Sequence, residues 1–258
     1  MISQVQKFKD LHHQTEPLLL GNVWDVQSAK VLETLGYKAL GTSSYAVAEM
    51  LGYEDGENIP FEEYLMIINR ITKSTSLPLS VDIESGFGAT DKVVIDNIVK
   101  LYNLGVVGIN IEDSIVKNGV RTLTDSKVFS QKIKNIATTL ALKNIEIFIN
   151  VRCDAFLLDI PNKMEEAKKR IKLYEENDID GIFLPCITDK DDIKEITKTI
   201  KYPLNVLGLP NFSDFDTLQK SGVKRISIGN FVNSRIYKEM TEICSKIKGE
   251  GNFSALFQ

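Results

Sequence analysis

Two carboxylates end an apolar stretch in the first third of the chain. Residues 79–88 read LSVDIESGFG, so a single residue separates Asp82 from Glu84, and glycines follow at once. Alternate side chains of a β-strand point to the same face, which brings both acids together. Two carboxylates ending a buried strand are costly to desolvate, and Mg²⁺ or Mn²⁺ prefers such hard oxygen ligands. The segment alone leaves two interpretations open: a divalent-metal site, or a helix-capping acid beside a solvated loop acid.

A second apolar stretch ends in acids as well. Residues 108–113 read GINIED, a short run that finishes with Glu112 and Asp113. If the two stretches are neighbouring strands of a parallel sheet, their carboxyl ends share one edge and Glu112 arrives beside the first pair. We therefore predict that Asp82, Glu84 and Glu112 surround one divalent cation.

A helix, one or two turn residues and a strand recur along the chain. The phrase reads LGYKAL, LGVVGIN, NDIDGIF and SGVKRIS, and eight strands can be counted, each followed by a helix. The strands are continuous apolar runs, as expected for a parallel sheet covered on both faces. Eight such units in about 250 residues are typical of an α/β protein with a (β/α)₈ TIM barrel. A doubly wound open sheet is the alternative, but no GxGxxG turn follows the first strand.

The pattern predicts one barrel domain over residues 1–258, with a polar leader at 1–17. The expected strands are 18–20, 38–42, 79–82, 107–111, 147–151, 181–184, 204–207 and 225–228. The expected helices are 25–35, 61–74, 90–104, 126–143, 163–176, 189–200, 213–220 and 231–248. Two longer connections, 46–60 and 114–125, are predicted to be loops, and the apolar residues of the last segment, 231–258, suggest that it docks on something.

Composition excludes several classes of protein. The 258 residues are 43% hydrophobic and 26% charged, and a net charge of −4 gives no reason to expect a nucleic-acid partner. The start of the chain lacks the apolar core of a signal peptide and no run is long enough to span a bilayer, which predicts a cytoplasmic protein without membrane contact. The three cysteines are scattered and suggest neither disulfides nor zinc. His12 and His13 precede the first strand, and we expect them on the surface.

The carboxyl ends of the strands carry the site in a (β/α)₈ barrel. Beside the acids, these ends offer Arg152, whose fork suits a carboxylate or phosphate, and the expected substrate contacts Trp24 and Asn205. A metal held by acids next to an arginine describes a site for a small anionic oxo-acid. Arg152 could instead form a structural ion pair with Asp154 or Asp113, and Trp24 could simply pack at the barrel rim.

The chain resembles the phosphoenolpyruvate mutase/isocitrate lyase superfamily. The matching stretches are GNVWDVQSAKVLETLGYKAL, MLGYEDGE, VDIESGFG, GINIEDS, FINVRCDAF, DGIFLPCIT and GVKRISIGN, in order from about residue 18 to 230. The resemblance implies a (β/α)₈ barrel that binds Mg²⁺ together with α-oxo-carboxylates or their enol forms. It also implies the making or breaking of C–C or P–C bonds next to the oxo group.

The resemblance assigns roles to the metal side of the site. Asp82, Glu84 and Glu112 match the acids that hold Mg²⁺, directly or through water. Asp55 matches an acid near the metal in the loop after the second strand, and Mn²⁺ is a possible replacement ion.

The resemblance also assigns roles on the substrate side. Ser43, with the backbone of Ser44 and Tyr45, matches the segment that grips the substrate carboxylate, and Arg152 matches the arginine beside that carboxylate. Asn118 falls roughly where phosphonate-handling members carry an asparagine in the loop after the fourth strand. The predicted catalytic residues are therefore Asp55, Asn118 and Arg152.

Two departures narrow the reaction that the resemblance implies. Isocitrate and methylisocitrate lyases carry a KKCGH-like motif after the fourth strand, whereas this chain reads SIVKNGVRTLTD, and the second strand ends in TSSY where the lyases are glycine-rich. We therefore expect a Mg²⁺-dependent lyase-type enzyme that acts on a small oxo-acid through an enolate. A phosphonopyruvate mutase or hydrolase and a non-catalytic oxo-acid-binding barrel are the alternatives.

Two further expectations concern the loop 114–125 and the last helix. We predict that the loop is a lid that brings Lys117, Asn118 or Arg121 towards a bound anion, with Gly119 permitting a hinge. Relatives assemble through their last helices, and the apolar tail fits a homo-oligomer, either a dimer or a tetramer.

Overall fold

A closed barrel of eight parallel strands forms the centre of the molecule. The computed structural model describes residues 3–210, 212 and 214–257. The barrel strands follow each other around the circle in the order β1-β10-β9-β8-β7-β4-β3-β2. They are β1 (Leu18–Val23), β2 (Leu40–Thr42), β3 (Leu79–Asp82), β4 (Gly108–Glu112), β7 (Phe148–Arg152), β8 (Gly181–Leu184), β9 (Leu204–Leu207) and β10 (Val223–Ser227). The predicted (β/α)₈ barrel is confirmed, and β3 and β4 are neighbours as expected.

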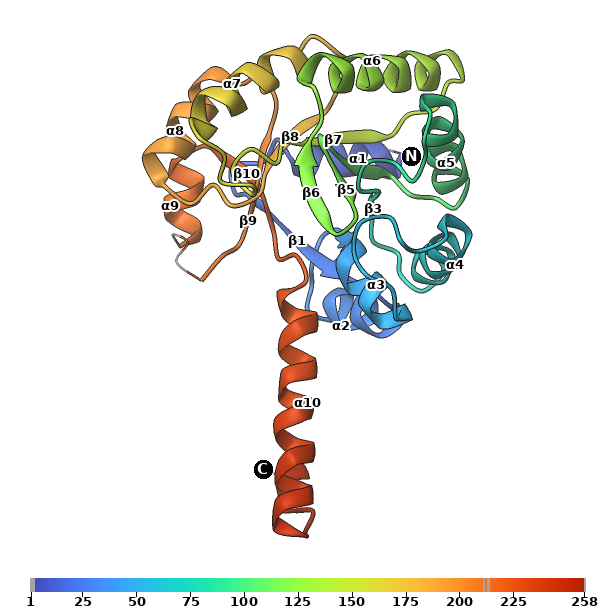
Figure 1. The fold of residues 1–258 in the computed structure, drawn as a ribbon, viewed down its shortest axis with the longest axis vertical. Helices are drawn as coiled ribbons and strands as arrows, with labels where there is room; N and C mark the ends of the chain where they lie inside the picture. The colour runs from blue at the N-terminus through green and yellow to red at the C-terminus, as the bar shows by residue number, and fades with distance from the viewer. Residues whose placement is uncertain (1–2, 211, 213, 258) are drawn as a thin grey trace.

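Helices surround the barrel and connect its strands (Figure 1). They are α2 (Val26–Thr34), α4 (Phe61–Thr72), α5 (Asp91–Asn103), α6 (Ser126–Leu142), α7 (Lys163–Tyr174), α8 (Lys190–Thr199) and α9 (Phe215–Lys220). Helix α4 illustrates why they pack, because it buries Tyr64, Ile68 and Ile71 at helical spacing. These helices agree with the predicted ranges to within a few residues. The predicted start of α9 at residue 213 lies outside the described residues.

The predicted polar leader is wrong, because its residues form helix α1 (Gln4–Leu11). The helix buries Val5, Phe8 and Leu11, which join Leu18 and other residues in a separate apolar cluster. Val5, Phe8 and Leu11 follow each other at intervals of three residues, and the polar residues between them hide this short amphipathic pattern. Helix α1 thus joins the apolar core instead of preceding it.

The surface location predicted for His12 is also wrong. His12 is 1% exposed, its Nδ1 lies 2.8 Å from the carbonyl oxygen of Phe8, and its ring stacks on Phe148 at 4.2 Å between centroids. His13 is exposed as expected. Burial, aided by the charge of Arg225, lowers the pKa of His12 to about 3.

The buried neutral imidazole of His12 predicts a pH-dependent stability. In the unfolded chain the His12 imidazole is protonated below about pH 6.5, whereas in the folded protein it stays neutral down to about pH 3. The His12 contribution to the free energy of unfolding should therefore fall by roughly 1.4 kcal/mol per pH unit as the pH drops through this window. Urea unfolding of the wild type and of His12→Phe between pH 4 and 7 measures the difference in slope. His13→Gln is the control, and equal slopes for wild type and His12→Phe would contradict the prediction.

The predicted loop 46–60 is wrong in its first part, where the chain forms helix α3 (Ser44–Leu51). The Ser43 Oγ caps the helix by accepting a hydrogen bond from the backbone N–H of Ala46 at 3.3 Å. Gly52 ends the helix in the left-handed region, with φ of 82°. The helix therefore presents its amino end directly after β2.

The predicted loop 114–125 is largely an antiparallel hairpin of β5 (Ser114–Lys117) and β6 (Val120–Leu123). Asn118 and Gly119 form its turn, with φ of 51° and 73°. An Asn-Gly pair between two short alternating segments is the usual signal of such a hairpin, and the sequence reading overlooked it.

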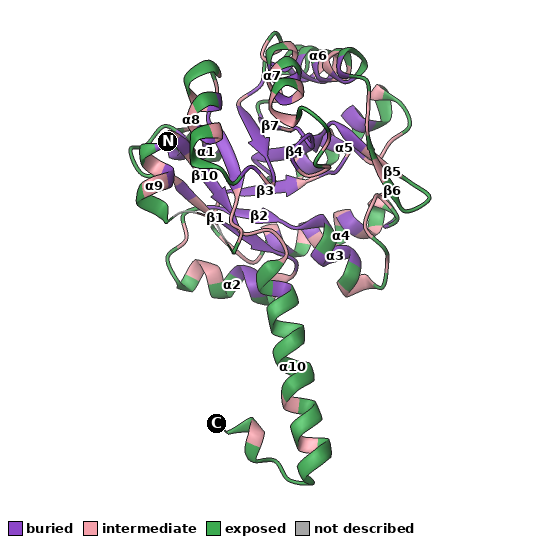
Figure 2. Cartoon of the chain, turned by 60° about the vertical axis from the view of Figure 1, so that its left-hand side comes forward, coloured by how far each residue is buried: buried purple, intermediate pink, exposed green. Residues whose placement is uncertain are grey.

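Helix α10 (Phe231–Glu250) follows the last barrel strand but projects away from the barrel (Figure 1). Almost its whole length is exposed, whereas the strands of the barrel are buried (Figure 2). A short 3₁₀ turn, Ser254–Leu256, folds back beside it. Within the described part of the chain, no helix combines the length and the apolar character needed to cross a membrane.

Candidate active site

A pocket of about 300 Å³ opens among the carboxyl ends of the barrel strands. Its lining combines residues from all eight strand ends with two residues of the long connections, Asp55 and Arg121. The polar members are Asn22, Thr42, Ser43, Ser44, Tyr45, Asp55, Asp82, Asn110, Arg121, Arg152, Ser227 and Asn230. This is the place where a (β/α)₈ barrel carries its site.

Asp82 is held by its backbone as well as by its side chain. The Thr42 Oγ1 accepts from the Asp82 N–H at 2.9 Å, and the Tyr64 hydroxyl donates to the Asp82 carbonyl oxygen at 2.8 Å. The Ser44 hydroxyl donates to the Asp82 Oδ2 at 3.0 Å. Burial raises the pKa of Asp82. The carboxylate is therefore fixed in position at the pocket wall before any ligand binds.

Glu84 follows in a strained turn. Its φ of 48° lies in the left-handed region that non-glycine residues rarely adopt. The turn is held by Glu57, whose Oε1 accepts from the Ser85 hydroxyl at 2.6 Å and from the Phe87 N–H at 2.9 Å. Burial and then the carboxylates of Asp55 and Asp82 raise the pKa of Glu84 to about 9. The Glu84 carboxyl group therefore lies near other carboxylates and forms no salt bridge with an arginine or lysine among the described residues.

Glu112 lies between two arginines. The Glu112 Oε1 accepts from the Arg121 guanidinium and from the Ser114 hydroxyl, and its Oε2 lies 3.0 Å from the Arg152 Nη1. Burial nevertheless raises the pKa of Glu112 to about 7, against the opposing charge of Arg152. The Glu112 N–H donates to the Glu84 carbonyl oxygen at 2.8 Å, so these two residues are adjacent. That they share a cation with Asp82 stays a prediction.

Arg152 forms the ion pair with Asp154 that the sequence left as an alternative. Its Nε lies 2.6 Å from Asp154 Oδ1 and its Nη2 3.2 Å from Asp154 Oδ2. Asp113 binds Arg170 and Tyr174 instead. Since a guanidinium has five N–H donors, the contacts with Asp154 and Glu112 leave two for a ligand. Arg152 therefore combines a structural ion pair with a place in the pocket wall.

Five predicted site residues are not among those that line this pocket. Glu84 and Glu112 line another cavity of about 300 Å³ instead. Trp24 lines a different, apolar pocket with α2 and the base of α10. Asn205 is 1% exposed and its Oδ1 accepts from the Ser227 hydroxyl, below the pocket floor. Asn118 lies in the exposed hairpin turn. Their assigned roles stay predictions.

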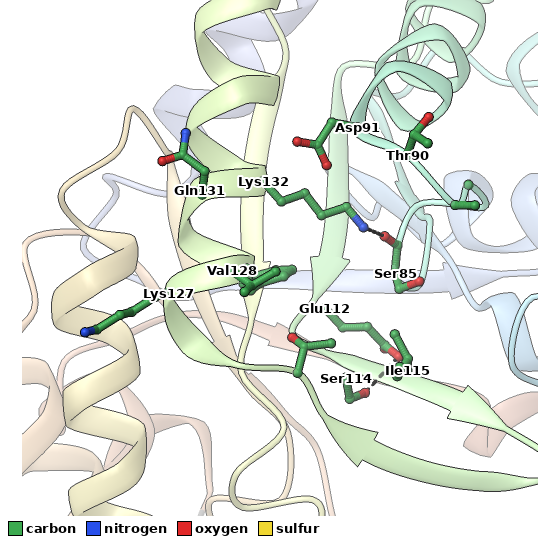
Figure 3. A pocket seen from close by; sticks show the side chains of 14 residues that line it. Ser85, Thr90, Asp91, Glu112, Ser114, Ile115, Lys127, Val128, Gln131 and Lys132 are labelled. Atoms are coloured by element: carbon green, nitrogen blue, oxygen red, sulfur yellow. Dashed lines mark hydrogen bonds between the residues drawn. The ribbon is translucent and has the colours of Figure 1, made fainter.

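A larger cavity of about 530 Å³ lies beside the pocket, between α5 and α6 (Figure 3). There the Lys132 Nζ donates to the Ser85 carbonyl oxygen, and burial lowers the pKa of Lys132. Glu112 and Ser114 lie at its inner side. Asp55, Asp82, Arg121 and Arg152 line the smaller pocket, so the acids and arginines of the candidate site are divided between the two cavities.

The residues around the pocket suit a divalent cation in kind and number. Five carboxylates face only two guanidinium groups, which leaves three uncompensated negative charges when all are ionised; they are Asp55, Asp82, Glu84, Glu112 and Asp154 against Arg121 and Arg152. The buried Glu112 Oε2 lies 3.0 Å from the Arg152 Nη1 in a salt bridge but accepts no hydrogen bond. In the described residues, however, no three acids, histidines or cysteines converge closely enough to hold an ion. The carboxylates are therefore ligands of the kind that Mg²⁺ prefers but are not converged on one point, and Arg121 contacts two of them, Asp55 and Glu112.

The chain matches the family described as phosphoenolpyruvate phosphomutase over residues 8–248. It belongs to this family. The superfamily membership suggested by the acid motifs is thereby confirmed, and the family assignment covers the barrel strands and most of α10.

The proteins similar to this chain have different assigned activities. The uncharacterized protein Rv1998c of Mycobacterium tuberculosis is 32% identical over 86% of this chain and 81% of that protein. An oxaloacetate decarboxylase of Paraburkholderia xenovorans is 26% identical over 81% of this chain and 70% of the relative. A solved structure from Burkholderia cenocepacia J2315, provisionally assigned as a phosphonomutase, is 30% identical, covers 94% of this chain and 99% of its own, and superposes with a TM-score of 0.87. Lyase and mutase chemistry is therefore represented among proteins similar to this one.

Proposed function

We propose that this protein is a Mg²⁺-dependent enzyme that cleaves or forms a C–C or P–C bond next to the oxo group of a small α-oxo-carboxylate. The charge imbalance at the pocket is the observation that carries the proposal. Asp82 and Glu84 lie without arginine or lysine partners among the described residues, beside a pocket that also holds two guanidinium groups. Such a site suits a cation and an anion bound together.

The acids would hold the cation, and each is prepared differently. Asp82 is fixed by Thr42, Tyr64 and Ser44, and Glu84 by its strained turn. A bound Mg²⁺ would act as a Lewis acid towards the negative charge that develops on the oxo oxygen. The rigid backbone contacts of Asp82 mean that little reorganisation is needed when that charge appears.

The amino end of α3 would hold the substrate carboxylate. The first N–H groups of a helix have no partners within the helix, and their dipoles favour an anion. Ser44 and Tyr45 begin α3 at the pocket wall. Arg152, on the other side of the pocket, would bind the second end of the substrate with its two remaining donors, which fixes the orientation of the scissile bond.

A panel of four substrates tests the proposal. Oxaloacetate, phosphonopyruvate, isocitrate and methylisocitrate are incubated with the protein, with and without Mg²⁺, and pyruvate or glyoxylate is measured. We expect release of pyruvate from oxaloacetate or phosphonopyruvate that depends on Mg²⁺. Absence of turnover with every substrate, together with tight Mg²⁺-dependent oxalate binding, would favour the non-catalytic oxo-acid-binding barrel.

Isocitrate and methylisocitrate should not be cleaved appreciably. The hairpin that replaces the lyase loop carries neither cysteine nor histidine, and no residue of either type lines the pocket among the described residues. Any proton for the enolate would then come from water or from another rim group such as Tyr45. Glyoxylate release from isocitrate and pyruvate release from methylisocitrate check this prediction, and rapid turnover of either substrate would contradict it.

We also propose that the protein assembles into a dimer or tetramer through α10. The exposed apolar residues of this helix include Phe231, Val232, Ile236, Tyr237 and Met240. At its base they border an apolar pocket of about 310 Å³ whose other wall is α2. A projecting helix with such a face is normally covered by a partner.

Charged substitutions on α10 should therefore dissociate the assembly. We expect Ile236→Asp combined with Met240→Asp to give a smaller species by light scattering after size exclusion. Lys238→Ala, on the same helix, is the control. An unchanged mass in the double variant, or a monomeric wild type, would contradict this oligomer.

A further inference from the structure

Arg121 occupies the gap between two acids of the candidate site. Its Nη2 lies 3.0 Å from Asp55 Oδ2, and its Nη1 contacts Glu112 Oε1 and lies 2.9 Å from the Ser114 Oγ. The same Nη1 is 3.5 Å from Asp154 Oδ2. The side chain is only 17% exposed. One guanidinium thus bridges the connection after β2 and the end of β4.

Asp55 and Glu112 are also two of the five carboxylates around the candidate site, and the family resemblance places both at or near the cation. The Glu112 oxygen that contacts Arg121 cannot at the same time coordinate a metal ion without a change in geometry. A guanidinium and a divalent cation that contact the same carboxylates also repel each other strongly in a buried site. Arg121 and a divalent cation are therefore alternatives at these oxygens.

We propose that Arg121 is a built-in counter-ion that a divalent cation displaces from Asp55 and Glu112, and that the displaced guanidinium then binds an anionic group of the substrate. The inference rests on the proposed function. It extends that function by predicting the order of binding. The cation binds first, and only then does Arg121 become available to the anionic substrate.

The position of Arg121 allows this second role. The residue lines the pocket at the strand ends together with Arg152, so a small rotation of the side chain keeps it within reach of a ligand there. It lies on β6, in a hairpin whose turn is formed by Asn118 and Gly119. Val116 of the same hairpin packs on Gly56, where an added Cβ would come within 2.7 Å of the valine side chain. Release of Arg121 should therefore loosen the hairpin from the connection after β2.

Three variants of the full-length protein separate this role from a structural one. Arg121→Met removes the charge but keeps a long stem, Arg121→Lys restores a charge, and Lys127→Met removes a charge from an exposed residue nearby. Titration calorimetry gives the affinity for Mg²⁺ alone, and a second titration gives the affinity for oxalate at saturating Mg²⁺. Hydrogen exchange of residues 114–123 is followed with and without Mg²⁺, and circular dichroism checks the fold.

We expect loss of the Arg121 charge to change the affinities for Mg²⁺ and for oxalate in opposite directions. Arg121→Met should bind Mg²⁺ about tenfold more tightly, because its competitor is gone, and oxalate about tenfold more weakly. Arg121→Lys should bring the Mg²⁺ affinity back towards that of the wild type, and Lys127→Met should change neither affinity more than about twofold. Mg²⁺ should accelerate hydrogen exchange of the hairpin in the wild type and have no such effect in Arg121→Met.

Two results would overturn the inference in distinguishable ways. If the wild type binds Mg²⁺ and Arg121→Met binds it equally or more weakly, Arg121 is not a competitor and the proposed function stands without it. If neither protein binds Mg²⁺, the proposed function itself fails, and the inference fails with it.

Discussion

Asp82→Ala should abolish Mg²⁺-dependent ligand binding while the barrel stays folded. The Asp82 N–H donates to Thr42 and its carbonyl oxygen accepts from Tyr64, and these contacts do not require its side chain. The substitution removes a buried carboxylate that forms no salt bridge with an arginine or lysine among the described residues, so folding should lose little. Calorimetric titration with Mg²⁺, followed by oxalate, measures the effect, and thermal unfolding reports on the fold.

The matched control for this experiment is Asp96→Ala, an exposed acid on α5. It removes the same charge and should leave the Mg²⁺ affinity unchanged. An Asp82→Ala protein with the Mg²⁺ affinity of the wild type would remove Asp82 from the metal site.

Arg152→Lys should weaken oxalate binding by more than about tenfold, or more than about 1.4 kcal/mol. A lysine provides a point charge and cannot reproduce the planar fork that contacts Asp154 and Glu112 while presenting two further donors. Asp154 is fully buried, so the variant should also unfold at a lower denaturant concentration. Oxalate titration at saturating Mg²⁺ and urea unfolding measure the two effects separately.

The two effects distinguish the roles of Arg152. A ligand-binding role requires the loss of oxalate affinity in protein that is still folded. If the oxalate affinity stays within about threefold, under about 1 kcal/mol, while stability drops, Arg152 is only the partner of the buried Asp154.

The barrel itself could be predicted because its signals are local and repeated. Each β/α unit has a strand that is buried on both faces and a helix that is buried along one side. The strand is therefore a continuous apolar run, the helix has apolar residues at intervals of three or four, and the change of spacing marks the boundary between them. The elements that were not predicted are those with only a short sequence pattern. Helix α1 shows only three apolar residues, α3 is an eight-residue helix, and β5 and β6 depend on a single Asn-Gly turn.

The positions of Asp82 and Glu112 could be predicted because each ends a strand. Their partners could not, since those contacts join segments distant in the sequence and depend on exact side-chain directions. The Ser44–Asp82 hydrogen bond spans 38 residues and the Arg121–Asp55 ion pair spans 66. The burial of His12 likewise depends on Phe148, which only the closed barrel brings beneath it.

A cation-dependent oxo-acid site is tested most directly by calorimetric titration of the wild-type protein with oxalate, in EDTA and then at saturating Mg²⁺. We expect no measurable binding in EDTA, because the uncompensated acids repel a dianion, and clear saturable binding when Mg²⁺ is present. Equal oxalate affinity under both conditions would contradict a site in which the acids hold a cation that in turn holds the oxo-acid.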